Sequence, residues 1–260
     1  MNSATSSNVS RPAISQPASL GRRILQQGRH ETLTMLRNGE QLTLAIVLPL
    51  LGLIALTVTP LLDNLGQARI DIAAPGVLAL CAMSTALTGQ GIATGFDRRY
   101  GVLRFLSTTP LGRTGLIVGK VAAVLAVLVI QVVVISAVAL LLGWQPNFPG
   151  LLLGITLLIL GALAFSSLGL LIAGTARPEA TLALANLLWI LFGALGGIVL
   201  PANRLPGMMQ DIVHFLPSGA LGDSMRQAFL GGGLDVFSVV ILVLWAVLAS
   251  AAAIKWFKWS

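Results

Sequence analysis

Residues 121–176 carry no charged side chain and read VAAVLAVLVIQVVVISAVALLLGWQPNFPGLLLGITLLILGALAFSSLGLLIAGTA. About 20 apolar residues are enough to cross a bilayer as a helix, so this stretch is too long for a single span. The sequence GWQPNFPG, at residues 143–150, breaks it in the middle. We therefore predict two membrane-spanning helices, at 121–142 and 150–176, joined by a tight hairpin that holds Trp144 at the membrane interface.

The composition of the whole chain agrees with a membrane protein. Of its 260 residues, 56% are hydrophobic and only 10% are charged, whereas about a quarter of the residues of a typical soluble domain are charged. A water-soluble fold of this length would not have enough polar residues to cover so many apolar side chains. The chain is therefore expected to use the lipid bilayer as its solvent.

Four further apolar stretches are long enough to cross the bilayer. They cover residues 41–62, 72–96, 180–200 and 236–254. Together with the two spans above, they predict an all-α integral membrane protein with six transmembrane helices in one domain at 20–260.

The basic residues predict how these spans are oriented, because Lys and Arg concentrate on the cytoplasmic side of membrane proteins. Placing the N-terminus inside puts 13 of the 16 Lys and Arg residues in cytoplasmic segments and leaves Arg69, Arg204 and Arg226 outside. Both termini are then cytoplasmic in a multi-pass protein of the cell membrane. Residues 1–19 are rich in Ser, Pro and Ala and lack the apolar core of a secretory signal, so we expect a disordered cytoplasmic tail.

Residues 20–40, between this tail and the first span, have the pattern of an amphipathic helix. Their apolar and small residues recur at helical spacing, at Leu20, Ile24, Gly28, Thr32, Met35 and Leu36. A helix with one such stripe and basic residues elsewhere is typical of the inner membrane surface. The alternative is a solvated cytoplasmic linker.

The segment at 201–234, before the last span, contains two short apolar stripes. The first consists of Met208, Met209, Ile212, Val213 and Leu216, and the second of Leu221, Met225, Ala228 and Phe229. Pro217 and Gly219 separate the stripes, and each half is too short to cross a bilayer. We predict two short helices that dip into the outer leaflet or cover the transport pathway.

No predicted span carries an ionisable residue near its middle. Carriers driven by protons or sodium commonly hold such a group there, so the energy for transport is expected to come from elsewhere. A buried ionisable pair would favour a carrier. A channel has little support, because Gln90, Gln131 and Asn186 are scattered and are typical of hydrogen bonds between helices.

Motifs for catalysis or nucleotide binding are not found in the sequence. Residues 115–121 (GLIVGKV) resemble a phosphate-binding loop, but the spacing is one residue short and Val121 replaces the Ser or Thr that would hold magnesium. Asp211 and His214 form only a weak metal pair, and the single Cys81 lies within an apolar run. The basic residues lie between apolar stretches, which indicates membrane orientation rather than nucleic-acid binding. We expect no enzyme activity, no bound metal and no nucleic-acid partner.

The most informative hydrophilic segment lies between the second and third spans and reads FDRRYGVLRFLSTTPLGR at residues 96–113. Val102, Leu103, Phe105 and Leu106 form a short apolar stripe among arginines, and Pro110 ends it. A short amphipathic helix with cationic flanks could bind lipid headgroups or present an apolar surface to a cytoplasmic partner.

This segment resembles the coupling loop of type-2 ABC export permeases, the membrane subunits of bacterial drug and antibiotic exporters. The shared features are an acidic–Arg pair at Asp97, then Gly101, then Leu-Arg-x-Leu from Leu103 and Thr-Pro-Leu ending at Leu111. The 201–234 segment is similar to the proline-rich stretch before the last span of that family. The residues that carry this second similarity are Pro201, Leu205, Pro206, Pro217 and Arg226.

The resemblance implies that two permease subunits, identical or paralogous, work with two copies of a cytoplasmic ATPase that binds ATP and magnesium. It implies that the 97–111 segment docks on that ATPase. The docking residues would be Asp97, Arg98, Gly101, Leu103, Arg104, Thr108, Pro110 and Leu111. Many relatives have a second acidic residue where this chain has Arg99, so a salt bridge made by that acid is not implied here.

We therefore predict the permease subunit of an ATP-driven exporter for an amphipathic or lipophilic molecule, such as a drug, a polyketide or a lipid. The alternatives are a secondary carrier or channel, and a membrane scaffold without transport activity. The apolar spans do not identify the substrate or the residues that bind it.

Overall fold

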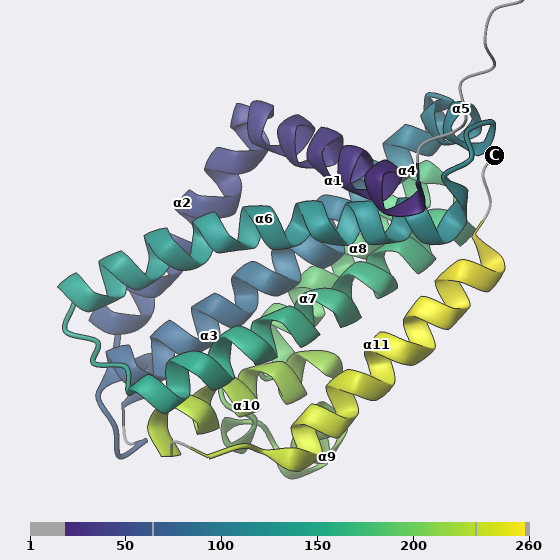
Figure 1. Ribbon diagram of the computed structural model, residues 1–260. Coiled ribbons are helices and arrows are strands. Elements are labelled where there is room, and N and C mark those ends of the chain that lie inside the picture. Colours follow the sequence, from purple (N-terminus) through teal and green to yellow (C-terminus); the bar gives the residue numbers. More distant parts are fainter. Residues whose placement is uncertain (1–18, 64, 232, 258–260) are drawn as a thin grey trace, which may run out of the picture.

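A computed structural model describes residues 19–63, 65–231 and 233–257, and every regular element in these ranges is helical. Five helices are long and apolar enough to cross a membrane. They are the continuous helix Arg69–Arg99, α6 (Gly112–Leu141), α7 (Phe148–Thr175), the helix Pro178–Leu195 and α11 (Val236–Trp256). Figure 1 shows them packed side by side as a bundle.

The N-terminal helices add a sixth candidate span. α1 (Leu20–Arg37) and α2 (Gly39–Val58) are bent by 67° relative to each other, and counting this pair as one span brings the total to six. A single 3₁₀ turn, η1 (Pro60–Leu62), follows α2 where the first predicted span continues to 62. The predicted all-helical membrane fold is confirmed.

Two of the long helices change their hydrogen-bonding pattern partway along. The helix Arg69–Arg99 consists of α3 (Arg69–Met83), the π-helical turn η2 (Ser84–Gly89) and α4 (Gln90–Arg99). The helix Pro178–Leu195 consists of α8 (Pro178–Ile190) and the π-helical turn η3 (Leu191–Leu195). It ends five residues before the predicted boundary at 200, because Gly197 has a left-handed backbone with φ of 81°.

The third predicted span begins earlier than expected. α6 starts at Gly112, nine residues before the predicted start at 121, so Lys120 lies within the helix instead of in a loop. In the hairpin between α6 and α7, Trp144 is 3% exposed and packs edge-on against Phe229, with the ring centroids 5.1 Å apart. Trp144 therefore anchors the hairpin to the protein interior.

The predicted amphipathic helix is present as α1, and it packs along α6. Gly28 meets Gly119 so closely that a Cβ atom added to Gly119 would lie 3.3 Å from the Gly28 backbone nitrogen. Further along both helices, Met35 packs with Ala123 and Val127. The stripe that the sequence assigns to the membrane surface is thus largely covered by α6.

The 201–234 segment forms the short turn η4 (Ala202–Arg204) and two short helices, α9 (Gly207–Phe215) and α10 (Pro217–Gly231), as predicted. α10 is almost entirely buried against α7, where Leu221 packs on Gly161 and Phe229 on Gly154. Gly161 is 13 residues after the start of α7, which places α10 up to about 20 Å inside the bundle. α9 is more exposed and lies at the end of the bundle where α11 begins (Figure 1).

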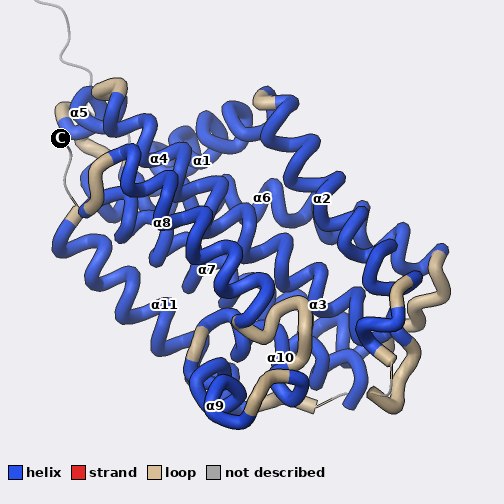
Figure 2. The backbone as a smooth tube through the Cα atoms, turned by 180° about the vertical axis from the view of Figure 1, so that it is seen from behind, coloured by secondary structure: helices blue, strands red, loops and turns tan. Residues whose placement is uncertain are grey.

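The opposite end of the bundle contains α5 (Val102–Ser107), which lies beside the C-terminal end of α11. Both views agree on this arrangement (Figure 2). The 97–111 segment and the α9–α10 pair therefore occupy different ends of the molecule.

Candidate functional site

The 97–111 segment consists of the end of α4, a tight turn and the short helix α5. α4 ends at Arg99, and Gly101 reverses the chain with a left-handed φ of 75°, a conformation that costs glycine little. After α5, the hydroxyls of Thr108 and Thr109 donate hydrogen bonds to the Phe105 and Leu106 carbonyls. These bonds satisfy carbonyls that the end of a helix would otherwise leave unpaired.

The inner face of α5 is anchored by a small apolar cluster. Leu103 is completely buried in this cluster, together with Leu111, Leu116 and Phe257, and Ile24 of α1 packs against the cluster. The cluster joins α5 to the beginning of α6, to the chain just beyond α11 and to α1. Leu103 is consequently not accessible to a docking partner, and its side chain holds α5 in place.

Arg98 connects the end of α4 to the end of α7. Its guanidinium donates hydrogen bonds to the carbonyls of Ala173, at 3.2 Å, and Ala176, at 2.8 Å. A cation at the C-terminal end of a helix is favourable because it meets the negative end of the helix dipole and unpaired carbonyls. Arg98 therefore braces the 97–111 segment from within the protein.

Asp97 belongs to a buried ionic cluster with Lys120 and Glu31. The Lys120 side chain is 0% exposed, and its ammonium nitrogen lies 2.9 Å from an Asp97 oxygen and 2.9 Å from a Glu31 oxygen. Gln27 donates a further hydrogen bond of 2.9 Å to Glu31. The cluster links α4, α6 and α1.

The outward face of the same unit combines aromatic rings with a cation. Tyr100 is 73% exposed and Phe105 72% exposed, and both Val102 and Arg104 are also exposed. Tyr100 stacks on Phe96, with the ring centroids 6.2 Å apart. We call Tyr100, Val102, Arg104 and Phe105 the outward face of the segment.

The structure thus divides the eight predicted docking residues into two groups. Asp97, Arg98, Leu103 and Leu111 form contacts within the chain. Arg104, Thr108 and Pro110 lie at the surface, where Pro110 also accepts a hydrogen bond from Arg23 of α1, and Gly101 forms the turn. The Arg99 side chain forms an exposed pair with Glu179 at 3.1 Å.

Sequence reasoning did not identify Lys120, Glu31 or the prominence of Tyr100 and Phe105. Lys120 directly precedes the uncharged stretch at 121–176, and Glu31 is the single acid of α1. A lone charge at the start of an apolar run reads as an orientation signal, so only the packing of α1 on α6 indicates its partner.

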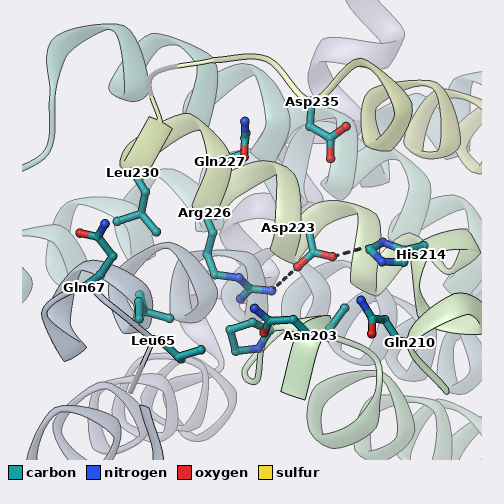
Figure 3. A pocket seen from close by; sticks show the side chains of 13 residues that line it. Leu65, Gln67, Asn203, Gln210, His214, Asp223, Arg226, Gln227, Leu230 and Asp235 are labelled. Atoms are coloured by element: carbon teal, nitrogen blue, oxygen red, sulfur yellow. Dashed lines mark hydrogen bonds and ion pairs between the residues drawn. The ribbon is translucent and has the colours of Figure 1, made fainter. Parts of the chain in front are cut away.

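The opposite end of the bundle is organised around Arg226, which is 6% exposed. Its guanidinium donates hydrogen bonds to the Ile198 carbonyl, at 2.8 Å, and to the Gly197 carbonyl. It also donates one to Asp223, at 2.8 Å (Figure 3). Residues 196–200 form no helix, and buried backbone carbonyls must find donors where lipid and protein replace water. Arg226 supplies these donors. Burial lowers the pKa of the Arg226 guanidinium, and the Asp223 carboxylate opposes the shift.

A polar pocket of about 320 Å³ lies beside Arg226. His214 borders it with its ring nitrogen 3.6 Å from the second oxygen of Asp223. The prolines of this end define its turns: Pro201 precedes η4, Pro206 precedes α9, and Pro217 begins α10. Leu205 lies in the turn between η4 and α9.

The two buried ionic groups are located near the ends of the helices. Lys120 is the ninth residue of α6, and Arg226 lies against Gly76, the eighth residue of the helix Arg69–Arg99. Buried ionisable pairs are thus present, but neither lies near the middle of a long helix, where carriers driven by ions commonly hold their coupling group. Deeper in the bundle, Gln131 bonds to Thr85 and to the Ala45 carbonyl, which confirms its predicted role between helices.

Comparison with known proteins agrees with this arrangement. The family described as ABC-2 type transporter matches residues 22–230. The putative transport permease YvfS of Bacillus subtilis (strain 168) is 29% identical over 173 residues, covering 64% of this chain and 68% of that protein. Nodulation protein J of Rhizobium leguminosarum bv. viciae is 30% identical over 166 residues, covering 61% of each protein and thus less than two thirds of its length. Because the family match extends over most of the chain and includes both ends of the bundle, this chain belongs to the ABC-2 type transporter family.

Proposed function

We propose that this chain is the membrane permease of an exporter driven by a separate ATPase, which docks on the outward face of the 97–111 segment. The ATPase would bind ATP and magnesium, and two copies would act with two permease subunits. The pathway would carry an amphipathic or lipophilic molecule out across the cell membrane.

The observation that carries this proposal is the contrast between the two faces of the 97–111 segment. Its inner face is fixed by the Leu103 cluster, by the Arg98 bonds to α7 and by the Asp97–Lys120 pair. Its outer face leaves two aromatic rings about three-quarters exposed beside Arg104. A rigid support beneath exposed aromatic and arginine side chains is typical of the centre of a protein–protein interface, where such residues contribute most of the binding energy.

The chemistry of the outward face also indicates its partner. A docking partner would need an apolar pocket for Phe105 and, beside that pocket, carboxylates or carbonyls that accept hydrogen bonds from Arg104. Basic residues are in excess at this end of the bundle, which favours a cytoplasmic position for the segment and for both termini. The partner would therefore be a cytoplasmic protein. The α9–α10 pair would then lie on the outer side.

The apolar cavity between α2, α3 and the helix Pro178–Leu195 supports a lipophilic substrate. It has a volume of about 380 Å³ and is lined by Leu56, Leu61, Leu80, Trp189, Ile190, Gly193, Ala194, Val199 and Leu200. Pockets of this size bury small ligands mainly through apolar contacts. A hydrocarbon or aromatic part of the substrate would fit such a lining.

The test is co-purification of the tagged permease with co-expressed ABC ATPase subunits from the same genome. Phe105→Asp places a charge at the centre of the outward face and should abolish co-purification. The matched control is Phe148→Asp, which makes the same change at a residue that is 79% exposed at the start of α7. An acid is favourable in the first turn of a helix, so this control should retain the ATPase. Equal retention by both variants would contradict the docking proposal.

A further inference from the structure

Lys120 bridges α4 and α6, which pack mainly on other helices. α6, which carries Lys120, packs along α1 and also contacts α3 and α7, whereas α4, which carries Asp97, packs mainly against α7 and α8. The Lys120 ammonium group lies between an acid on α4 and an acid on α1, at 2.9 Å from Asp97 and 2.9 Å from Glu31. A completely buried lysine is costly unless it is paired, so the site depends on these two carboxylates.

The Asp97–Lys120 pair also closes the base of the 97–111 segment. The two residues are 23 positions apart, and the chain between them contains the turn at Gly101, α5 and the first turns of α6. A force on α5 could bend the chain between Asp97 and Lys120 without moving α4 or α6. An ion pair between α4 and α6 opposes such bending, because separating the pair would take one of its two carboxylates from the buried Lys120.

We infer that Lys120 is a positioning residue that joins the 97–111 segment to α6, so that displacement of the outward face moves α4 and α6 together. This inference rests on the proposed function, in which an ATPase displaces that face. Lys120 touches neither nucleotide nor partner, because its side chain has no exposed surface. Glu31, its second partner, holds α1 against α6 and does not connect to the docking segment.

The alternative hypothesis is that the Glu31–Lys120–Asp97 cluster only stabilises the fold and does not transmit movement. The two acids distinguish these roles, because Asp97→Asn and Glu31→Gln make the same chemical change and each leaves Lys120 with one carboxylate. The Glu31 side chain is 13% exposed and the Asp97 side chain 31% exposed, and Glu31 also accepts a bond from Gln27. A purely stabilising cluster therefore predicts at least as much damage from Glu31→Gln. The positioning role predicts that only Asp97→Asn weakens the link between α4 and α6.

The experiment measures the movement of α6 in the complete permease–ATPase complex. Spin labels are placed at Val129→Cys on α6 and Met208→Cys on α9, which are 63% and 82% exposed, while the single native Cys81 is 0% exposed. Distances between the labels are recorded without nucleotide and with ATP and magnesium in a hydrolysis-blocked ATPase. Coupling between sites commonly changes an equilibrium by about 5- to 150-fold, which is large enough to shift the distance distribution visibly.

The expected result is a nucleotide-dependent distance change in the parent and in Glu31→Gln, and its loss in Asp97→Asn with ATPase binding retained. A second variant, Glu31→Gln with Asp97→Asn and Lys120→Met, removes all three charges with little change in shape. Such replacements often leave stability intact, so this variant should assemble with the ATPase and also lose the distance change.

An unaltered distance change in either Asp97→Asn or the triple variant would overturn the inference. Equal loss in Glu31→Gln would also overturn it, as would loss of ATPase binding in Asp97→Asn. Failure of the parent itself to bind an ATPase would instead overturn the proposed function, and that result is obtained before any variant is tested.

Discussion

The guanidinium of Arg98 donates a 2.8 Å hydrogen bond to the carbonyl of Ala176, so the last turn of α4 is fastened to the last turn of α7. These residues are 78 positions apart, and Arg98 is two residues before Tyr100 of the outward face. The segment is therefore supported by a long helix on each side, α7 through Arg98 and α6 through Lys120.

Arg98→Met should destabilise the folded protein. The change removes charge-assisted bonds to two carbonyls, each of which is worth about 1.5–3 kcal/mol where it is shielded from water. The neighbouring Arg99→Met removes only an exposed pair with Glu179 and should change stability by less than about 1 kcal/mol. Thermal unfolding in detergent compares the two variants. Equal unfolding temperatures would mean that Arg98 does not support the bundle.

Met225→Asp should prevent correct folding, whereas Ile212→Asp should be tolerated. Met225 is 0% exposed on α10, and Ile212 is 55% exposed on α9, although both belong to apolar stripes of the same segment. A buried, unpaired carboxylate is strongly destabilising, whereas the same group at a wet surface is not. Yield of monodisperse protein after gel filtration measures the outcome. Similar loss from both changes would show that α9 is also covered in the assembled transporter.

The helices, the hairpin at 143–150 and the two short helices of the 201–234 segment are predictable from the sequence, because apolar length and periodicity determine them directly. The exposed side of α5 is not. Four apolar residues in a six-residue helix cannot show that Leu103 faces inward and Phe105 outward, because this depends on Leu116 and Phe257 from distant parts of the chain.

The ionic cluster is likewise invisible in the sequence. Glu31 and Lys120 are 89 positions apart, and their pairing follows from the close approach of α1 and α6 at Gly28 and Gly119. The family resemblance names Arg226 but not its partners, since the carbonyls that it binds become available only where the helix Pro178–Leu195 stops at Leu195. Lone charges beside apolar runs satisfy the rule for membrane orientation, and that rule does not reveal their partners.

Cysteine labelling of intact cells tests the proposed orientation. Met208→Cys, at a residue that is 82% exposed on α9, should react with a membrane-impermeant maleimide. Phe105→Cys, at a residue that is 72% exposed on α5, should react only after the cells are opened. The native Cys81 is 0% exposed and should remain silent in both experiments. Labelling of Phe105→Cys from outside would reverse the orientation.

The most direct test of the account is photo-crosslinking from position 105 in living cells, with a photoreactive phenylalanine analogue in place of Phe105. Docking of an ATPase on the outward face predicts a specific adduct whose second component is an ABC ATPase subunit. The same analogue at position 148, at the start of α7, should give no such adduct. An ATPase adduct that is absent at position 105, or equally strong at position 148, would contradict the claim that the 97–111 segment receives the ATPase.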